Sequence, residues 1–299
     1  MSTSRFVNKF RNVATITEQR SDGTAVARLK TGQYTYSGCY IGVRSKVEIV
    51  GKTVAVDGKH YVKSANLPEF VGEIRLEIDN VVERNLSCAR HIAFNQKDGY
   101  DVQDGIIYMP FGGPFQFDNM AVEDVYQLGT KDVRDLEITF DLTAAWDNSN
   151  MFLEIMSEYT SSVRPIGFLR TTKTLIRNAT GAGEFTIDGL PIHSDIAAIY
   201  VLGSNIKSAV LTVDDVEVES AGNYWIAARN KLFGVNTDAL GDGVVFDFLR
   251  DKDVNKGLKS LESNAQRKRN ADLLITLDMM DAEELTVIVD QIGRYAQQG

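Results

Sequence analysis

Residues whose types and spacing suit catalysis are few in this chain of 299 residues. Cys88 and His91 come closest, because an imidazole beside a thiol can activate a cysteine nucleophile. Side chains three positions apart on one helix are, however, usually simple neighbours. His60 and His193 stand in unrelated contexts, and no HExxH or other ligand spacing connects the three histidines. We therefore predict no catalytic residue among them.

Paired carboxylates are a second candidate, since glycosidases place two acidic residues on either side of the scissile bond. Glu137 and Asp141 share one face of the phrase "LEITFDL", and Asp214 and Glu217 do so approximately. We favour a solvated sheet face for both pairs. The glycine-rich "TGAGEF" leads into a strand pattern and therefore predicts a turn and not a phosphate-binding loop. No catalytic or cofactor-binding residue is predicted.

Two acidic clusters offer the oxygen ligands that Ca²⁺ prefers. They are Asp98, Asp101 and Asp104, and Asp238 with Asp242. The second cluster lies in "DALGDG", which fails the EF-hand template at Leu240. No metal ligand can be assigned from these patterns. A structural calcium ion stays open, and no cofactor is required.

The composition is that of a folded, acidic protein. Hydrophobic residues make up 43% and charged residues 24% of the chain, which is typical of soluble domains. The net charge of −9 argues against a general nucleic-acid binder, because neutralising phosphates needs a surplus of Lys and Arg. Cys39 and Cys88 cannot form a disulfide framework, so a reduced, cytosolic origin is expected. The longest apolar runs, such as "IAAIYVL", are too short to span a bilayer.

Short alternating runs dominate the chain and predict a mostly β protein. In "LEITFDL" the apolar Ile138 and Phe140 alternate with polar residues, as in a strand with one buried face. Six Asp-Gly pairs punctuate the chain and favour tight β-turns. Many short strands between turn signals predict an antiparallel sandwich or barrel.

Two helices are predicted between these strands. "SAGNYWIAARNKLFG" has Ser220 as a candidate N-cap and Gly234 as its stop, with Trp225, Ala228 and Leu232 on one stripe at helical spacing. "SCARHIAFN" begins at Ser87. The polar "NKGLKSLESNAQRKRN" is a third candidate, on the outside of a loop.

Several phrases recur in one order at nearly one distance. "LEIDNV" (76–81) and "LTVDDV" (211–216) are 135 positions apart, and "LEITFDL" (136–142) and "LLITLDM" (273–279) are 137 apart. The candidate caps Ser87 and Ser220, the two "IA" pairs, "IIYMPF" with "VVFDFL", and "FLEIMSEY" with "LTVIVDQI" repeat at 133 to 138. Six collinear landmarks favour two copies of one β-domain over two unrelated sandwiches.

The order of elements within each copy predicts a jelly roll. Several strands, a capped helix and three more strands are compatible with an eight-stranded jelly-roll sandwich. Pro165 and the small polar residues before it suggest a hinge near residues 161–164. We predict an all-β fold of two tandem jelly rolls, a double jelly roll with short helices in the loops. The first spans residues 1–162, including an N-terminal tail 1–17, and the second spans 163–299.

The strand phrases resemble those of a known family, the double jelly-roll major capsid proteins of tailless, membrane-containing bacteriophages of the corticovirus and autolykivirus kind. The likeness lies in "LEITFDL", "RTTKTLIRNATGAGEFTIDGLP" with "IAAIYVLG", "AVLTVDDVEV", "VVFDFLRDKDV" and "ADLLITLDMMDAEELTVIVDQIGRY". It covers most of the chain from about Glu73 onward, and it rests on strands and not on catalytic signatures. In that family three subunits form a trimer whose six jelly rolls stand upright and tile the shell.

The resemblance implies a structural protein that is not an enzyme. Its expected partners are copies of itself, as a homotrimer and as neighbouring capsomers, and vertex or membrane-associated viral proteins, with no sequence-specific nucleic acid. Its expected location is the capsid shell of the virion, assembled in the host cytoplasm. Members of the family can carry calcium between subunits, but no position here matches a motif that can be transferred.

The N-terminus and two rival functions stay open. Arg5, Lys9 and Arg11, with Phe6 and Phe10 between them, could touch an internal viral membrane or packaged DNA, or form an ordinary solvated tail. A carbohydrate-binding or glycosidase-type β-sandwich would need an exposed aromatic platform or a groove with paired carboxylates. A viral receptor-binding spike would need a trimerising shaft or an attachment domain. The sequence singles out none of these features.

Overall fold

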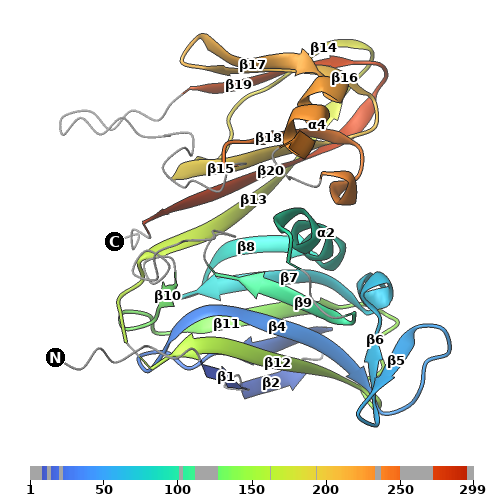
Figure 1. The fold of residues 1–299 in the computed structure, drawn as a ribbon, viewed down its shortest axis with the longest axis vertical. Coiled ribbons are helices and arrows are strands. Elements are labelled where there is room, and N and C mark those ends of the chain that lie inside the picture. The colour runs from blue at the N-terminus through green and yellow to red at the C-terminus, as the bar shows by residue number, and fades with distance from the viewer. Residues whose placement is uncertain are drawn as a thin grey trace. The chain divides into compact units, whose positions relative to one another are not determined.

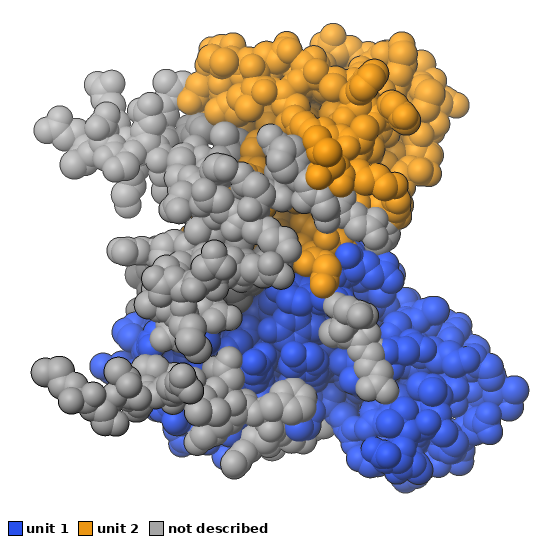
Figure 2. All heavy atoms as spheres, in the orientation of Figure 1, with its two compact units in different colours: residues 1–96, 100–169, 294–299 blue, residues 97–99, 170–293 orange. Residues whose placement is uncertain are grey.

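The computed structural model describes residues 9–11, 15–19, 23–100, 104–111, 127–161, 163–192, 194–232, 237–249 and 272–294. The chain divides into two compact units, which Figure 2 colours separately. Unit 1 comprises residues 1–96, 100–169 and 294–299, and unit 2 comprises residues 97–99 and 170–293. The domain ranges 1–162 and 163–299 stay a prediction.

Unit 1 is built from two antiparallel sheets (Figure 1). The first has the order β1 (Lys9–Arg11), β12 (Met151–Thr160), β4 (Thr35–Ser45), β6 (Lys59–Val62) and β5 (Thr53–Val56), with β9 (Ile106–Pro110) and β10 (Leu128–Gly129) also paired to β4. The second has the order β8 (Val81–Ser87), β7 (Val71–Ile78), β11 (Leu136–Leu142), β3 (Thr24–Arg28) and β2 (Thr15–Gln19). The helical segments are η1 (Ser64–Asn66), α1 (Leu67–Phe70) and α2 (Cys88–Asp98), whose last two residues belong to unit 2. Residues 9–11 and 15–17, expected in a tail, are therefore strand residues of β1 and β2.

The core of unit 1 lies between its two sheets. From β11, Ile138 and Phe140 are fully buried, as the alternation predicts. They belong to one apolar cluster with Leu76 of β7, Ile41 of β4 and Ile155 of β12. Residues from both sheets therefore share one core, which is the arrangement of a β-sandwich.

Unit 2 repeats this plan. One sheet has the order β14 (Gly183–Ile187), β19 (Leu273–Met279), β16 (Ile206–Val213) and β17 (Val216–Gly222). The other has the order β13 (Phe168–Ala179), β20 (Glu283–Arg294), β15 (Asp195–Leu202) and β18 (Gly243–Asp247). The helical segments described here are α4 (Asn223–Leu232) and η3 (Asp238–Leu240). Ile275, Leu277, Val287 and Phe246 are fully buried in a core of their own.

The strand orders show that both units are jelly rolls. The run β3-β11-β7-β8 of unit 1 matches β14-β19-β16-β17 of unit 2, and β12-β4-β9 matches β20-β15-β18. The repeated phrases fall on matching strands, since "LEITFDL" is β11 and "LLITLDM" is β19. The fold class predicted from the sequence, a double jelly roll, is confirmed.

Two local contacts repeat with the strands. β7 and β16 both end in a two-residue turn with positive φ, at Asp79-Asn80 (50° and 67°) and at Asp214-Asp215 (48° and 64°). Asp79 Oδ1 accepts the N–H of Asp135 and Asp214 Oδ1 accepts the N–H of Asp272, each at 2.9 Å. These turns of the I′ type join the strands of a hairpin in each copy.

A second repeated contact fixes each helix to a strand. Asn95 of α2 donates from Nδ2 to the carbonyl of Tyr108 on β9, at 2.7 Å. Asn230 of α4 donates in the same way to the carbonyl of Val245 on β18, at 2.8 Å. The two asparagines are 135 positions apart, which is the spacing of the repeat. Asn95 and Asn230 are therefore equivalent positions, and they align α2 with α4 residue by residue.

The predicted helix starts have different outcomes. Ser87 caps α2 as expected, since its Oγ accepts the N–H of Arg90 at 3.3 Å. Ser220 does not cap α4, because it lies in β17 opposite Val210, and the strand continues to Gly222. Gly234 and the third candidate helix (255–270) lie outside the described residues. No helix in the described part of the chain is long and apolar enough to cross a membrane.

Candidate functional site

The Cys88 and His91 side chains are both buried, at 0% and 2% exposure. Burial raises the pKa of the Cys88 thiol to about 12, so it carries no thiolate near neutral pH. Cys39 is equally buried, and its pKa is also raised to about 12 by burial. His60 lies on β6, in a hairpin, and His193 lies outside the described residues. The buried thiols are therefore placed for packing and not for nucleophilic attack.

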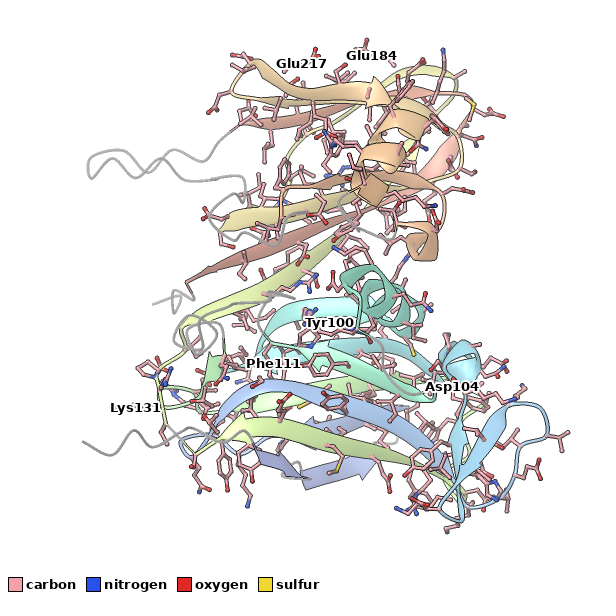
Figure 3. All side chains as sticks on the ribbon, viewed as in Figure 1. Tyr100, Asp104, Phe111, Lys131, Glu184 and Glu217 are labelled. Carbon is pink, nitrogen blue, oxygen red and sulfur yellow. The ribbon has the colours of Figure 1, made fainter. Side chains whose placement is uncertain are left out.

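The four acidic residues of the two candidate carboxylate pairs lie in different surroundings. Glu137 Oε1 accepts from Arg28 Nε at 2.6 Å, and Asp141 Oδ1 accepts from Arg75 Nη2 at 2.5 Å. Asp214 is held in its hairpin turn. Glu217 is exposed on β17, where Figure 3 labels it. Glu137 and Asp141 thus lie in cross-strand ion pairs on a partly exposed sheet face, as the sequence predicts.

The members of the acidic clusters have separate partners. Asp104 accepts the N–H of Ser64 at 2.7 Å, and Asp238 lies 3.5 Å from Lys231. Asp98 is buried in ion pairs, and Asp101 is not among the described residues. No group of three or more possible metal ligands occurs within the described ranges. The calcium ion stays a proposal.

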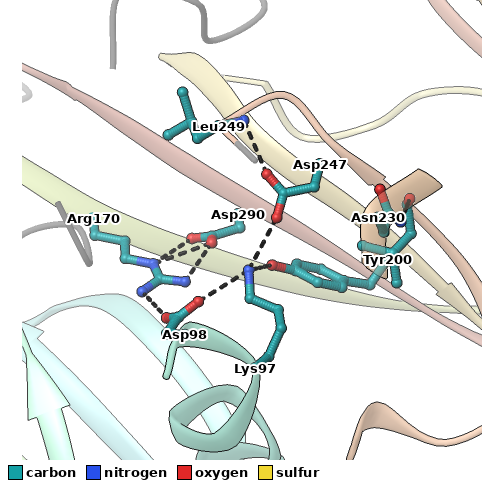
Figure 4. Close-up of polar contacts among 9 residues, drawn as sticks. Lys97, Asp98, Arg170, Tyr200, Asn230, Asp247, Leu249 and Asp290 are labelled. Atoms are coloured by element: carbon teal, nitrogen blue, oxygen red, sulfur yellow. Dashed lines mark hydrogen bonds and ion pairs between the residues drawn. The ribbon is translucent and has the colours of Figure 1, made fainter. Parts of the chain in front are cut away.

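Unit 2 encloses a buried cluster of charged and polar side chains (Figure 4). We call it the polar cluster, and its side chains are those of Lys97, Asp98, Arg170, Tyr200, Asp247 and Asp290. Arg170 binds Asp290 through Nε (2.9 Å) and Nη2 (2.7 Å), and it binds Asp98 through Nη1 (2.7 Å). Lys97 Nζ lies 3.0 Å from Asp98 and 3.3 Å from Asp247. It also donates to the Tyr200 hydroxyl at 2.7 Å.

The charges of the polar cluster stabilise one another. Burial alone would raise the pKa of Asp98, but the charges of Arg170 and Lys97 outweigh it and hold that pKa below its ordinary value. Burial opposes the charged form of Lys97 as well, yet Asp98 and Asp247 raise its pKa well above the usual value. Both cations and Asp98 are therefore charged at neutral pH. Since these side chains are 3–6% exposed, the cluster holds elements together and does not meet a substrate.

A signal for the polar cluster exists in the sequence, although it is weak. Asp247 and Asp290 each stand alone inside an apolar strand phrase, "VVFDF" and "LTVIVDQI". An acidic residue in such a run implies a buried partner, because an unpaired buried charge is too costly. The partners, Lys97 and Arg170, are 120 or more positions away and cannot be found from spacing.

Unit 1 contains a half-open cavity of about 230 Å³. Tyr40, Tyr61, Glu154 and Met156 contribute to its lining, together with Asp104, which is labelled in Figure 3. Glu154 accepts from the Tyr61 hydroxyl at 2.6 Å, so its carboxylate is already engaged. The cavity offers aromatic and apolar walls and no reactive pair.

The predicted stripe on α4 exists, but it faces outward. Trp225 is 70% and Leu232 is 81% exposed, whereas Ile226 and Asn230 form the buried face. Helical spacing shows that residues share a face, but it does not show whether that face meets the core.

Known proteins share this fold and part of this sequence. Residues 168–295 match the family described as the viral coat protein P2 C-terminal domain. The major capsid protein P2 of bacteriophage PM2 has a similar structure, with a TM-score of 0.78, 18% identity and coverage of 98% of this chain and 100% of that one. No curated protein sequence matches the chain.

More distant capsid structures share the fold as well. A chain of Sulfolobus turreted icosahedral virus matches with a TM-score of 0.58, 9% identity and coverage of 98% of this chain and 90% of that one. A chain of the PBCV-1 capsid matches with a TM-score of 0.51, 8% identity and coverage of 98% and 95%. Residues 168–295 thus match the viral coat protein P2 C-terminal domain family, and the whole chain has the double jelly-roll fold of these capsid structures.

Proposed function

We propose that this chain is the major capsid protein of a tailless icosahedral phage and assembles as pseudo-hexagonal homotrimers that tile the shell. The observation that carries the proposal is the duplication. Two jelly rolls with the same strand order lie in one chain, down to the matching turns at Asp79 and Asp214. Three such subunits supply six similar rolls.

Simple geometry connects six rolls to a shell. A closed threefold ring uses heterologous contacts, in which two different surfaces of each subunit meet. Two similar rolls per subunit give such a ring a nearly hexagonal outline, and hexagons cover a surface without gaps. Permanent interfaces of this type bury on the order of 2,000 Å² or more.

The same proposal names the partners and the location. Trimers would contact neighbouring trimers and vertex or membrane-associated viral proteins in the virion shell, after assembly in the host cytoplasm. Arg5, Lys9 and Arg11 would face an internal membrane or the genome, and a calcium ion could lie between subunits. The ion pairs of Glu137 and Asp141 do not favour the glycosidase alternative.

The mass of the protein in solution tests the proposal. One chain has a mass of 33.2 kDa, so a trimer has about 100 kDa (three times 33.2). Size-exclusion chromatography with light scattering should give that mass over a wide range of protein concentration. Electron microscopy of concentrated trimers should show hexagonal outlines. A monomer at all concentrations would contradict the trimer, and a monomer that binds a glycan would favour the carbohydrate-binding alternative.

A further inference from the structure

The outward face of α4 carries a row of apolar side chains, here called the α4 stripe: Tyr224, Trp225, Ala228 and Leu232. Tyr224 is 78%, Trp225 is 70% and Leu232 is 81% exposed. Each aromatic side chain buries 150–250 Å² when covered, so the stripe offers on the order of 400 Å² of contact area. The largest apolar patch on a typical monomer is of about this size and is often functional.

The α4 stripe is exposed although the helix is firmly attached to unit 2. Asn230, on the opposite face, is fully buried and donates to the carbonyl of Val245. Ile226 packs in the core of unit 2. Arg229 forms an ion pair with Glu219 of β17. The helix is therefore fixed in its orientation, with its apolar row outside.

The first copy of the repeat provides an internal comparison. With Asn95 aligned to Asn230, Arg90 of α2 stands where Trp225 stands, and Lys97 stands where Leu232 stands. Ala89 and Gln96 are the exposed residues of α2, and its other residues are buried or half-buried. Lys97 itself is enclosed in the polar cluster. The jelly roll thus does not require apolar residues on this face of the helix.

The surroundings of the α4 stripe fit a protein partner better than a lipid surface. Arg229 is paired with Glu219 and Lys231 with Asp238, so the cations beside the stripe face carboxylates of the same chain. Helices that bind membranes present Lys and Arg toward anionic lipids, and this chain has a net charge of −9. An apolar centre with Trp and Tyr inside a polar rim is typical of a protein interface.

We infer that a second copy of this chain covers the α4 stripe in the assembled trimer. The inference rests on the proposed function and names the surface through which one subunit meets the next. In a closed ring every subunit has a neighbour on both sides, so one second copy is available for each α4. The rings of Tyr224 and Trp225 lie 5.8 Å apart and are nearly perpendicular, at 80°. The two rings would together fill a pocket of the neighbouring subunit. They do not form the flat platform that a sugar ring needs.

Substitution of the stripe tests this inference. Trp225→Glu with Leu232→Glu places two charges on the surface that the second copy must cover. Val50→Glu is the matched control, because Val50 is 86% exposed in the β4–β5 loop of unit 1. We expect wild type and Val50→Glu to be trimers, and the double variant to be monomeric, with an apparent dissociation constant raised at least a hundredfold. Circular dichroism should show the same fold in all three, since the changed side chains are exposed in the single chain.

Tryptophan fluorescence gives a second readout, which reports the surroundings of Trp225 directly. The chain has two tryptophans, Trp146 and Trp225, so the difference between wild type and Trp225→Phe isolates Trp225. Its emission should be blue-shifted in the trimer and move to the red in Leu232→Glu, which keeps the indole but removes the contact.

The outcomes separate this inference from the proposed function. A trimeric wild type with a monomeric double variant supports both. If the double variant stays trimeric and Trp225 of the wild-type trimer has a red emission, the α4 stripe is not the subunit contact, although the trimer stands. A wild type that is monomeric at all concentrations overturns both. Flotation of wild type, but not of the double variant, with vesicles of phosphatidylethanolamine and phosphatidylglycerol would assign the stripe to lipid and overturn the inference.

Discussion

At the scale of single residues, the polar cluster of unit 2 has an unequal set of charges. Lys97 and Arg170 are two cations, and Asp98, Asp247 and Asp290 are three carboxylates. Asp98 touches both cations, at 3.0 and 2.7 Å. Asp247 touches only Lys97 among these cations, at 3.3 Å, and its other oxygen accepts the N–H of Leu249. The carboxylates are therefore not equivalent, and Asp98 is the one that links the two cations.

Asp98→Asn should destabilise the protein more than Asp247→Asn. Loss of the Asp98 charge leaves Arg170 and Lys97 without their common partner, and removing one partner of a buried ion pair costs about 3–5 kcal/mol. Asp247→Asn breaks one longer contact in a cluster with an excess of negative charge, so we expect about 1–2 kcal/mol. Urea unfolding at pH 7, followed by circular dichroism, measures both. Asp188→Asn, at an exposed position, is the control, with an effect within about 0.5 kcal/mol.

Acid should weaken the wild type through Asp98. Its pKa in the folded protein lies below the ordinary 3.8, so the folded state favours the ionised carboxyl. The resulting stability is present above about pH 4 and is lost as the pH falls through the folded pKa. The free energy of unfolding should therefore drop more between pH 5 and pH 3 in wild type than in Asp98→Asn. If the free energy of unfolding falls equally with pH in wild type and in Asp98→Asn, the loss of stability in acid does not come from Asp98.

At the scale of elements, α2 and α4 are each bound to the following strand by a buried asparagine, but with different numbers of hydrogen bonds. Asn95 Nδ2 donates to the Tyr108 carbonyl and its Oδ1 accepts the Tyr108 N–H, at 2.7 and 3.0 Å. Asn230 donates to the Val245 carbonyl alone. α2 is therefore held to β9 by a two-point bond, and α4 is held to β18 by one bond.

Asn95→Ala should cost more stability than Asn230→Ala. A buried partner left without its hydrogen bond costs about 1–3 kcal/mol, and Asn95→Ala leaves two such groups on Tyr108. We expect about 3 kcal/mol for Asn95→Ala and about 1.5 kcal/mol for Asn230→Ala in urea unfolding. Gln96→Ala, next to Asn95 but exposed, should change stability little. Equal effects of Asn95→Ala and Gln96→Ala would show that the helix-to-strand bond is not needed.

The elements also show how far the sequence could lead. The alternation of Ile138 and Phe140 with polar residues predicts a half-buried strand over "LEITFDL", and this prediction is confirmed. Helical spacing predicts that Trp225 and Leu232 share one face of a helix, but it does not predict that this face is exposed. The polar cluster cannot be predicted from spacing, because Asp290 pairs with Arg170 across 120 positions and only the folded sheets bring them together.

At the scale of the whole molecule, the two units have separate cores but are not separate in sequence. Each core cluster draws on residues of its own unit. Unit 2 nevertheless includes residues 97–99, which lie 71 positions before its main segment begins at residue 170 (170 − 99). A boundary drawn at residue 162 assigns Lys97 and Asp98 to the first jelly roll and their partners Arg170 and Asp247 to the second.

A fragment of residues 163–299 should therefore be less stable than the second jelly roll in the full chain. Without Lys97 and Asp98, Arg170 keeps Asp290, and the Asp247 carboxylate has lost the cation beside it. A buried carboxylate without a cation is unfavourable, so Asp247→Asn should raise the thermal midpoint of the fragment, although it lowers that of the full chain. Thermal unfolding followed by circular dichroism, on both lengths with and without the substitution, measures this reversal of sign. If Asp247→Asn lowers the midpoint of the fragment as it does in the full chain, the missing residues 97–99 are not what destabilises the isolated roll.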